Sequence, residues 1–270
     1  MSVKFCTIAS GSSGNCTYVA AGNNAVLVDA GLAGRVIEEG LQVQGIDPKS
    51  LTAIFVTHDH GDHIKGAGVL SRRFNLPLYM TAGTWAYAEK YKILGKISPA
   101  NKMVVRNGVD VKLDCMTITP FTLPHDASEP VGYAIYAQGC KVAIATDLGH
   151  VSPHVATHIA GADIVLIEAN YDKDMLARGP YPAHLKQRIS GTMGHLSNVC
   201  CGAFLADIIC GKTKYVFLGH LSQENNRPII AHETIKNILL ARKIDVGGAI
   251  GLYVADRHRP SAMITLNDGD

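Results

Sequence analysis

The chain has 270 residues, of which 47% are hydrophobic and 18% are charged, and its formal net charge is +2. This composition excludes a disordered chain and indicates a compact globular protein, while the length allows one large α/β domain or two small ones. The seven cysteines include no Cys-x-x-Cys pair, which favours reduced thiols over a structural zinc site.

The first elements are period-two strands, which we expect at Lys4–Ala9, Thr17–Ala20 and Ala25–Asp29. The loop between the first two strands, Ser10–Cys16, consists of small and polar residues. Such a loop can present N–H groups and hydroxyls to an anion, or it can be a plain flexible turn. Asp29 leaves the end of a buried strand, where a carboxylate is well placed to hold a site together.

The densest polar motif follows a helix predicted at Arg35–Gln44 and a strand predicted at Leu51–Thr57. Three histidines and two aspartates fall within the six positions from His58 to His63. Residues two apart in extended backbone point the same way, so His58 and His60 can share a metal. Asp62 and His63 open a helix predicted to run to Phe74 and can reach a second metal, while Asp59 faces away. The alternative is a polar loop with accidental histidines.

These residues resemble the His-x-His-x-Asp-His signature of the metallo-β-lactamase superfamily. The resemblance implies an α/β fold of the four-layer αββα sandwich type, with two sheets back to back between helices. It also implies that Asp29 supports the metal ligands through hydrogen bonds without binding metal itself.

Further ligands are expected downstream of a strand at Leu78–Met80, a helix at Gly83–Tyr91 and several strands between Met103 and Phe121. His125 follows an apolar strand; it is either an ordinary loop residue or, by the resemblance, the next ligand, with Asp126 orienting the site. A hairpin predicted at Gly132–Ala137 and Lys141–Ala145 leads to Asp147. This aspartate either caps a helix or matches the carboxylate that bridges both metals in the superfamily.

The second half of the chain contains five more histidines of interest. His150, His154 and His158 recur at four-residue intervals, which is typical of a metal-binding stripe or, as we prefer, of a surface helix. A strand predicted at Asp163–Glu168 is followed by a loop around Pro180 and Pro182. His195 comes after this loop and directly before a helix predicted at Ser197–Cys210.

His220 ends the strand that begins at Tyr215 and fits the final metal ligand of the superfamily. A helix at Pro228–Arg242 and strands at Ala249–Val254 and Ala262–Leu266 complete the pattern. We find no linker or low-complexity segment, so we expect a single domain over residues 1–270. No apolar run is long enough to span a bilayer, and the first residues lack the pattern of a signal peptide. We therefore expect a cytoplasmic protein with no membrane partner.

The resemblance assigns His58, His60 and His125 to one metal. It assigns Asp62, His63 and His220 to the other, with Asp147 shared. All these ligands are nitrogen or oxygen donors, which suits zinc, manganese or iron. Two divalent ions about 3.5–4 Å apart can lower the pKa of bound water to about 7 and so supply a hydroxide nucleophile at neutral pH. Asp62 is also expected to orient that water.

The later motifs suggest a phosphodiester substrate. Glu168-Ala169-Asn170, Gly194-His195-Leu196-Ser197 and His220-Leu221-Ser222 follow an order similar to that of the ribonuclease Z branch. In that branch, the histidine that matches His195 protonates the leaving oxygen or holds a phosphate. The alternative is a histidine that merely hydrogen-bonds a neighbour.

Motifs along the whole chain look like those of the YycJ/WalJ family, from Gly11–Asn15 through Thr57–His63 and Thr146-Asp147 to His220–Asn226. This resemblance implies a 5′-to-3′ DNA exonuclease with DNA as its partner. Backbone phosphates would then be received by the polar side chains of Ser12, Ser13, Asn15, Ser222 and Asn225.

Two other functions fit the residues less well. The same two metals could hydrolyse a small ester, thioester or lactone, since one fold can host many hydrolyses. A non-enzymatic binding module would require a defect in the ligand set, and the motifs contain none.

Overall fold

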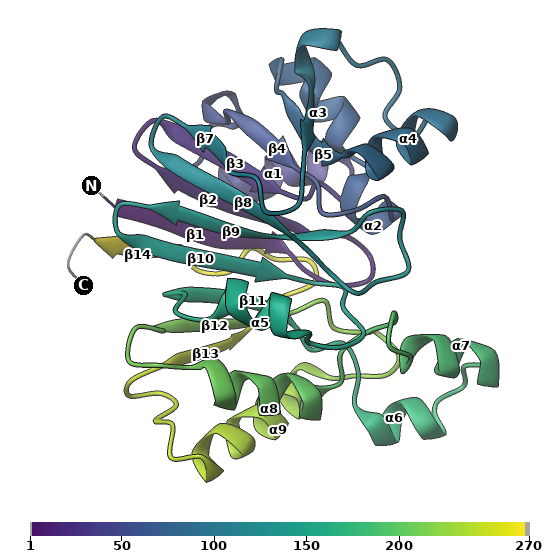
Figure 1. Cartoon of the computed structure of the whole chain (residues 1–270), viewed down its shortest axis with the longest axis vertical. Helices are drawn as coiled ribbons and strands as arrows, with labels where there is room; N and C mark the ends of the chain where they lie inside the picture. Colours follow the sequence, from purple (N-terminus) through teal and green to yellow (C-terminus); the bar gives the residue numbers. More distant parts are fainter. Residues whose placement is uncertain (1, 268–270) are drawn as a thin grey trace.

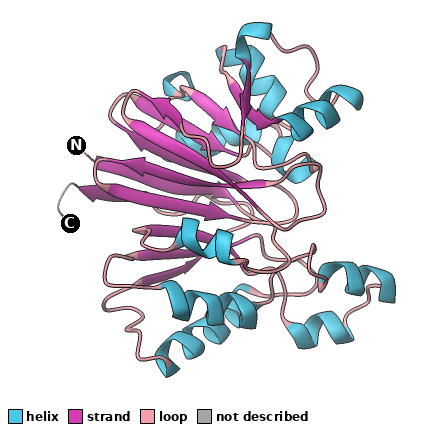
Figure 2. Cartoon of the chain, viewed as in Figure 1, coloured by secondary structure: helices cyan, strands magenta, loops and turns pink. Residues whose placement is uncertain are grey.

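The computed structural model describes residues 2–267, so residue 1 and residues 268–270 of the predicted domain lie outside the described part. Its strands form two seven-stranded sheets that lie face to face in the middle of the molecule (Figure 1). Helices cover the outer face of each sheet (Figure 2). This is the predicted four-layer αββα sandwich.

The first sheet is built from the N-terminal part of the chain and one C-terminal strand. Its order is β14 (Ile264–Asn267), β1 (Ser2–Ala9), β2 (Cys16–Ala21), β3 (Asn24–Val28), β4 (Ala53–Phe55), β5 (Leu78–Thr81) and β6 (Lys102–Val105). Strands β14 to β3 pair antiparallel and β3 to β6 pair parallel. The outer face carries α1 (Gly34–Val43), α2 (Gly61–Ile64), α3 (Ala67–Phe74) and α4 (Ala82–Lys90).

The second sheet repeats this plan. Its order is β13 (Gly251–Val254), β12 (Tyr215–Gly219), β11 (Ile164–Glu168), β10 (Cys140–Ala145), β9 (Val131–Ala137), β8 (Met116–Thr122) and β7 (Val111–Leu113). Strands β7 to β10 pair antiparallel and β10 to β13 pair parallel. The helices that follow are α5 (Pro153–Ile159), α6 (Lys173–Arg178), α7 (Ala183–Ile189), α8 (Asn198–Ile208) and α9 (Pro228–Ala241).

Three apolar layers hold the sandwich together. Alternate residues of each strand point to opposite faces, so Val19 and Phe55 enter the layer between the sheets with Tyr133 and Phe217 of the second sheet. Intervening residues such as Leu27 pack under the helices of the first half. A third cluster fills the space between the second sheet and α5, α8 and α9.

The structure confirms most predicted elements and corrects four. The strand predicted at Leu51–Thr57 is only Ala53–Phe55. The helix predicted from Asp62 to Phe74 is two helices, because the amide of Gly66 donates to Ala30 O instead of to Asp62 O, and Asp62 O accepts from Asn15 N. These long-range bonds replace the helical bond between residues 66 and 62.

The other two corrections concern the second half of the chain. His154 and His158 lie on the surface helix α5, as preferred, but His150 precedes it and its Nδ1 donates to Thr192 O at 2.9 Å. Helices α6 and α7 were not predicted. The loop expected around Pro180 and Pro182 is only the turn between them, and both helices project from the body of the sandwich (Figure 1).

No helix among residues 2–267 combines the length and apolar character needed to cross a lipid bilayer.

Candidate metal centre

The predicted site residues gather where parallel strands of both sheets end. His58 lies just beyond β4 of the first sheet, while Asp147 and His220 lie just beyond β10 and β12 of the second. Since the carboxyl ends of neighbouring parallel strands share one edge of a sheet, segments far apart in sequence meet there.

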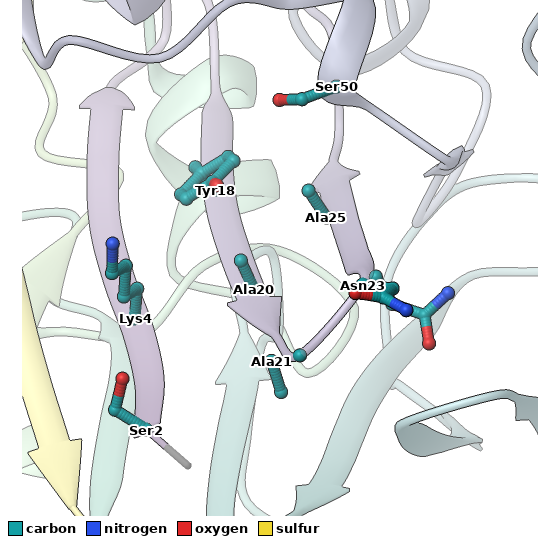
Figure 3. A pocket seen from close by; sticks show the side chains of 10 residues that line it. Ser2, Lys4, Tyr18, Ala20, Ala21, Asn23, Ala25 and Ser50 are labelled. Atoms are coloured by element: carbon teal, nitrogen blue, oxygen red, sulfur yellow. The ribbon is translucent and has the colours of Figure 1, made fainter.

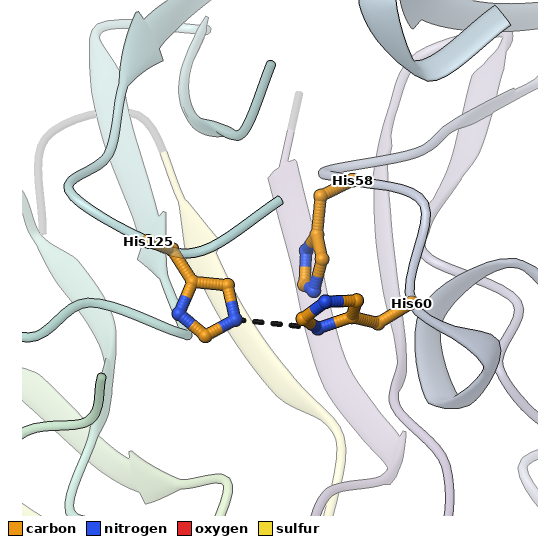
Figure 4. Close-up of side chains that lie close together, drawn as sticks. All are labelled: His58, His60 and His125. Atoms are coloured by element: carbon orange, nitrogen blue, oxygen red, sulfur yellow. Dashed lines mark hydrogen bonds between the residues drawn. The ribbon is translucent and has the colours of Figure 1, made fainter. Parts of the chain in front are cut away.

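Three histidines form one half of the site. His58, His60 and His125 point toward one another (Figure 4), and each has a ring nitrogen within 4.8 Å of the other two. Nδ1 of His125 donates to Gly194 O at 3.0 Å, which leaves the lone pair of Nε2 facing Nδ1 of His60 at 3.3 Å. In the metal-free protein these two nitrogens hydrogen-bond each other, as the dashed line in Figure 4 marks, and a shared cation would replace that hydrogen bond.

His58 offers the clearest test of whether the site suits a metal ion. Its Nδ1 lies 2.9 Å from the hydroxyl of Thr57, which in turn donates to Asp29. Nε2 of His58 is buried and finds no hydrogen-bond partner among residues 2–267. Burial, with added repulsion from His63, holds the pKa of His58 well below its ordinary value. A neutral, buried imidazole with an unused lone pair fits a divalent metal.

Asp62, His63 and His220 form the other half. Oδ2 of Asp62 lies 3.2 Å from Nε2 of His220 and 3.6 Å from Nε2 of His63. Asp62 and His63 come from the short helix α2, and His220 comes from the opposite sheet. The residues predicted for the second metal therefore also lie within ligand distance of one another.

Asp147 lies between the two halves. Its Oδ1 is 3.6 Å from Nε2 of His125 and 3.4 Å from Nδ1 of His220, and its Oδ2 is 3.0 Å from Nε2 of His63. Oδ2 has no partner in hydrogen-bonding geometry among the described residues. Burial alone would raise the pKa of Asp147, but His220 and His63 hold it well below its usual range. The carboxylate is ionised and central, as a bridging ligand would be.

The charge balance also favours bound cations. Burial opposes protonation of His63, but Asp29 and Asp147 raise the pKa of this histidine well above its ordinary value. Burial likewise opposes protonation of His220, yet the carboxylates, Asp147 first, raise its pKa to about 10. In the metal-free protein, protons on these rings therefore compensate the buried carboxylates, and divalent ions would take over that role.

Two further carboxylates fix the orientation of ligands. Asp29 accepts from the amide and hydroxyl of Thr57 and lies 2.7 Å from Nδ1 of His63, so that Nε2 of His63 points into the site. Glu168 is fully buried, and its Oε1 lies 2.8 Å from Nδ1 of both His220 and His195. Glu168 was not among the predicted site residues; the signal it carried in the sequence was a carboxylate at the end of a buried strand.

Three residues of the site have left-handed backbone. The φ angles are 64° for Asp29, 63° for Asp147 and 52° for His220. This conformation is unfavourable for residues other than glycine and clusters at functional sites. Here it turns each side chain sharply away from the strand that it follows and toward the shared centre.

Close backbone packing holds α2 in place. A Cβ atom built on Gly31 would lie 1.6 Å from Asp62 O, and one on Gly66 would lie 2.2 Å from Leu32 O. Only glycine permits the loop after β3 to lie against α2 at this distance. The positions of Asp62 and His63 therefore depend on Gly31 and Gly66.

Asp126 and His195 lie beside the metal-ligand cluster. Oδ1 of Asp126 is 3.5 Å from Nε2 of His125, but its main partner is Arg188, at 2.5 Å. His195 is oriented by Glu168 and remains 16% exposed, so one edge of its ring faces open space. Asp59 points out of the cluster and accepts from Ser128 N at 3.2 Å.

The residues predicted to bind substrate have two kinds of environment. Ser12 and Ser13 are exposed, 3.2 and 3.4 Å from Nη1 of Arg257. Ser222 is half-buried and accepts from Asn225 N at 3.1 Å. Asn15 and Asn225 are buried. The amide of Asn15 lies 3.0 Å from Nε2 of His63 and bonds Gly11, so it faces the interior of the site rather than solvent.

A separate hollow of about 510 Å³ lies at the other end of the first sheet (Figure 3). It is lined by Lys4, Tyr18 and Ser50 among others and contains none of the predicted site residues. Ser2, at one end of β1, lines the hollow, whereas Ser10, beyond the other end of β1, contacts His220. The hollow is therefore remote from the metal-ligand cluster.

Comparisons with known proteins agree with this geometry. The family model described as a β-lactamase superfamily domain matches residues 24–220. The exodeoxyribonuclease YycJ of Bacillus anthracis is 36% identical over 264 residues, which cover 97% of this chain and 99% of the relative. The exodeoxyribonuclease WalJ of Streptococcus pneumoniae serotype 2 is 38% identical over 250 residues, 93% of each chain.

Among solved structures, the metallo-β-lactamase fold protein YhfI from Bacillus subtilis superimposes with a TM-score of 0.73 at 15% identity. The match covers 97% of this chain and 99% of that one, which shows the shared fold.

Proposed function

Since the chain belongs to the β-lactamase superfamily and is a hydrolase of that superfamily, we propose that it is a metal-dependent exodeoxyribonuclease that degrades DNA from the 5′ end. The observation that carries the proposal is the combination of an intact seven-residue ligand cluster with full-length similarity to two proteins named exodeoxyribonuclease. The alternative, hydrolysis of a small ester, thioester or lactone, has no comparable support.

The donor set supports two divalent ions. His58, His60 and His125 would hold one and Asp62, His63 and His220 the other, with Asp147 between them. The donors are imidazole nitrogens and carboxylate oxygens, which suits zinc or manganese and also permits iron. When bound, such ions supply Lewis-acid polarisation of the scissile phosphate and lower the pKa of water.

The chain's own groups supply orientation and a proton. Asp62 is the most exposed of the carboxylates in the cluster, at 24%, and is suited to accept a hydrogen bond from the attacking water. His195 faces open space on one edge while Glu168 holds its other edge. Burial opposes protonation of His195, but Glu168 raises its pKa above the ordinary value. The ring is therefore suited to give a proton to the leaving oxygen.

The proposed location is a reducing compartment such as the cytoplasm. The two exposed cysteines, Cys200 and Cys210, are free thiols, which suits a compartment where thiols stay reduced.

The test uses single-stranded DNA labelled at either end, a matching RNA strand and a panel of chromogenic thioesters and lactones. With added Mn²⁺ or Zn²⁺, we expect mononucleotides to be released from the 5′ end of DNA, and this activity to be lost in His60→Ala. His154→Ala removes a surface histidine and is the matched control. Turnover of the small esters by a metal-loaded protein that leaves every DNA strand intact would refute the proposal.

A further inference from the structure

A cavity of about 450 Å³ lies directly beside the metal-ligand cluster. Its lining includes His195 itself and Gly149, which follows Asp147 by two residues. The opposite wall is formed by α6 and α7, through Lys173 and Lys186. The cavity therefore joins the site to the segment that the sequence did not predict to be helical.

The wall formed by α6 and α7 is anchored at both ends. Tyr171, Leu176 and Ile189 form a small apolar cluster that packs the two helices together. Arg188 of α7 forms an ion pair with Asp126, next to the ligand His125. Since the helices are tied to each other and to the loop that carries His125 and Asp126, the cavity exists before any ligand enters it, as is usual for small-molecule sites.

The charge of the cavity is positive. Neither Lys173 nor Lys186 forms an ion pair within residues 2–267; Nζ of Lys186 donates to Ala177 O at 2.7 Å. Two carboxylates flank Lys173 in sequence, Asp172 and Asp174, but neither lines the cavity. Asp172 caps α6 by accepting from the amides of Asp174 and Met175. Two ammonium groups without a carboxylate partner, beside the aromatic ring of Tyr171, suit an anionic ligand with a flat apolar part.

We propose that this cavity holds the 5′-terminal nucleotide of the DNA strand, with its phosphate on Lys173 and Lys186. This inference rests on the proposed function and specifies which part of the substrate the enzyme recognises. The volume lies toward the lower end of the range of about 300–1,000 Å³ typical of small-ligand pockets and suits a single nucleotide.

The position of His195 fits this placement. In the reaction, water forms a new bond to the phosphorus between the first and second nucleotides, and the bond from phosphorus to the 3′ oxygen of the first nucleotide breaks. That oxygen takes a proton and the first nucleotide leaves as a 5′-monophosphate. Because His195 lines the cavity, a proton donor stands beside the nucleotide that leaves. The remaining strand carries a new 5′-phosphate, so each cycle regenerates the group that the lysines recognise.

Binding can be tested without turnover, because the exposed thiol of Cys200 also lines the cavity. In protein freed of metal with EDTA, we expect thymidine 5′-monophosphate to slow alkylation of Cys200 by about five-fold or more at saturation. Cys210 is also exposed but lies outside the cavity and is the internal control. Thymidine should protect much less, and the Lys173→Gln/Lys186→Gln variant should lose the protection. Equal protection of both thiols, or of neither, would overturn the inference.

Kinetics supply the second readout. For 5′-phosphorylated DNA, we expect the Lys173→Gln/Lys186→Gln variant to raise KM about ten-fold or more, since charge-assisted contacts are lost. For 5′-hydroxyl DNA, KM should stay within about two-fold of the wild-type value. Lys92→Gln/Lys96→Gln changes the net charge equally at exposed residues away from the cavity and should alter neither KM.

The outcomes separate the two proposals. If the wild-type protein degrades DNA but the lysine pair behaves like the control pair, the cavity does not read the terminal phosphate. If the monophosphate protects Cys200 but the metal-loaded protein cleaves no DNA, the proposed function fails while the nucleotide site stands.

Discussion

Glu168 is the residue whose replacement tests the architecture of the site most directly. Its side chain is fully buried, and Oε1 lies 2.8 Å from Nδ1 of His195 and of His220. Oε2 accepts from the amides of Leu148 and Leu196 at 3.1 and 3.0 Å. Burial would raise its pKa, but His195 and His220 lower it, so the carboxylate is ionised and accepts four hydrogen bonds.

The substitution Glu168→Gln keeps the shape and replaces one oxygen by an amide nitrogen that can only donate. If that nitrogen faces Leu148 and Leu196, two buried amides lose their acceptor. A buried donor without a partner costs about 1–3 kcal/mol, so we expect the two amides together to lower the free energy of unfolding by about 2–6 kcal/mol. If the nitrogen faces the imidazoles instead, their Nδ1 atoms must lose their protons, because an amide N–H can only donate. The proton of a neutral His220 then sits on Nε2, and that nitrogen cannot bind metal.

The assay is urea unfolding of the EDTA-treated protein, followed by circular dichroism, together with the metal content of the untreated protein. Glu129→Gln is the matched control, because its exposed carboxylate accepts a single bond from Gly83 N at 2.6 Å, which an amide oxygen can also accept. We expect this control to change stability by less than about 0.5 kcal/mol. A Glu168→Gln variant with wild-type stability and wild-type metal content would refute the reasoning.

Three other predictions follow from the site. His60→Ala should lose bound metal by elemental analysis and at least about 100-fold in activity, whereas His154→Ala should lose neither. Gly31→Ala should cost about 3 kcal/mol or more in urea unfolding, because its Cβ would meet a carbonyl 1.6 Å away; Gly61→Ala, with open space around it, should cost less than about 1 kcal/mol. Metal-free protein should lose stability as pH rises from about 6.5 to about 10. The reason is that His220, with a pKa raised to about 10, keeps its charged contacts with carboxylates at low pH and loses them on deprotonation. A free energy of unfolding that rises over this pH range, measured by urea titration in EDTA, would contradict this prediction.

Much of the fold could be predicted because its signals are local. Period-two runs bounded by small polar turns mark β1 to β3, and the turn Gln138-Gly139 marks the β9–β10 hairpin, where both residues have positive φ as a tight hairpin requires. The spacing of His58 and His60 likewise depends only on extended backbone. The meeting of these residues with His125 and His220 is not local, and only the resemblance to a family predicted it.

The features that sequence reasoning missed depend on distant contacts. The break after α2 arises because Ala30 and Asn15 take the hydrogen bonds that would continue the helix. Helices α6 and α7 are short, and Pro182 looked like a loop signal although proline also suits a helix start. Asn225 is buried in a position that its polar surroundings in sequence do not indicate.

The left-handed backbone at Asp29, Asp147 and His220 has a consequence for engineering. Glycine, or in part asparagine, would adopt these φ angles at lower cost, but the exchange would also remove buried contacts, such as those of Asp29 with Thr57, Asp147 with His63 and His220 with Glu168. The same exchange would delete a proposed metal ligand or its support. A search for stabilising substitutions that ranks positions by backbone conformation alone would therefore select these three residues wrongly, and should be combined with a screen for retained metal.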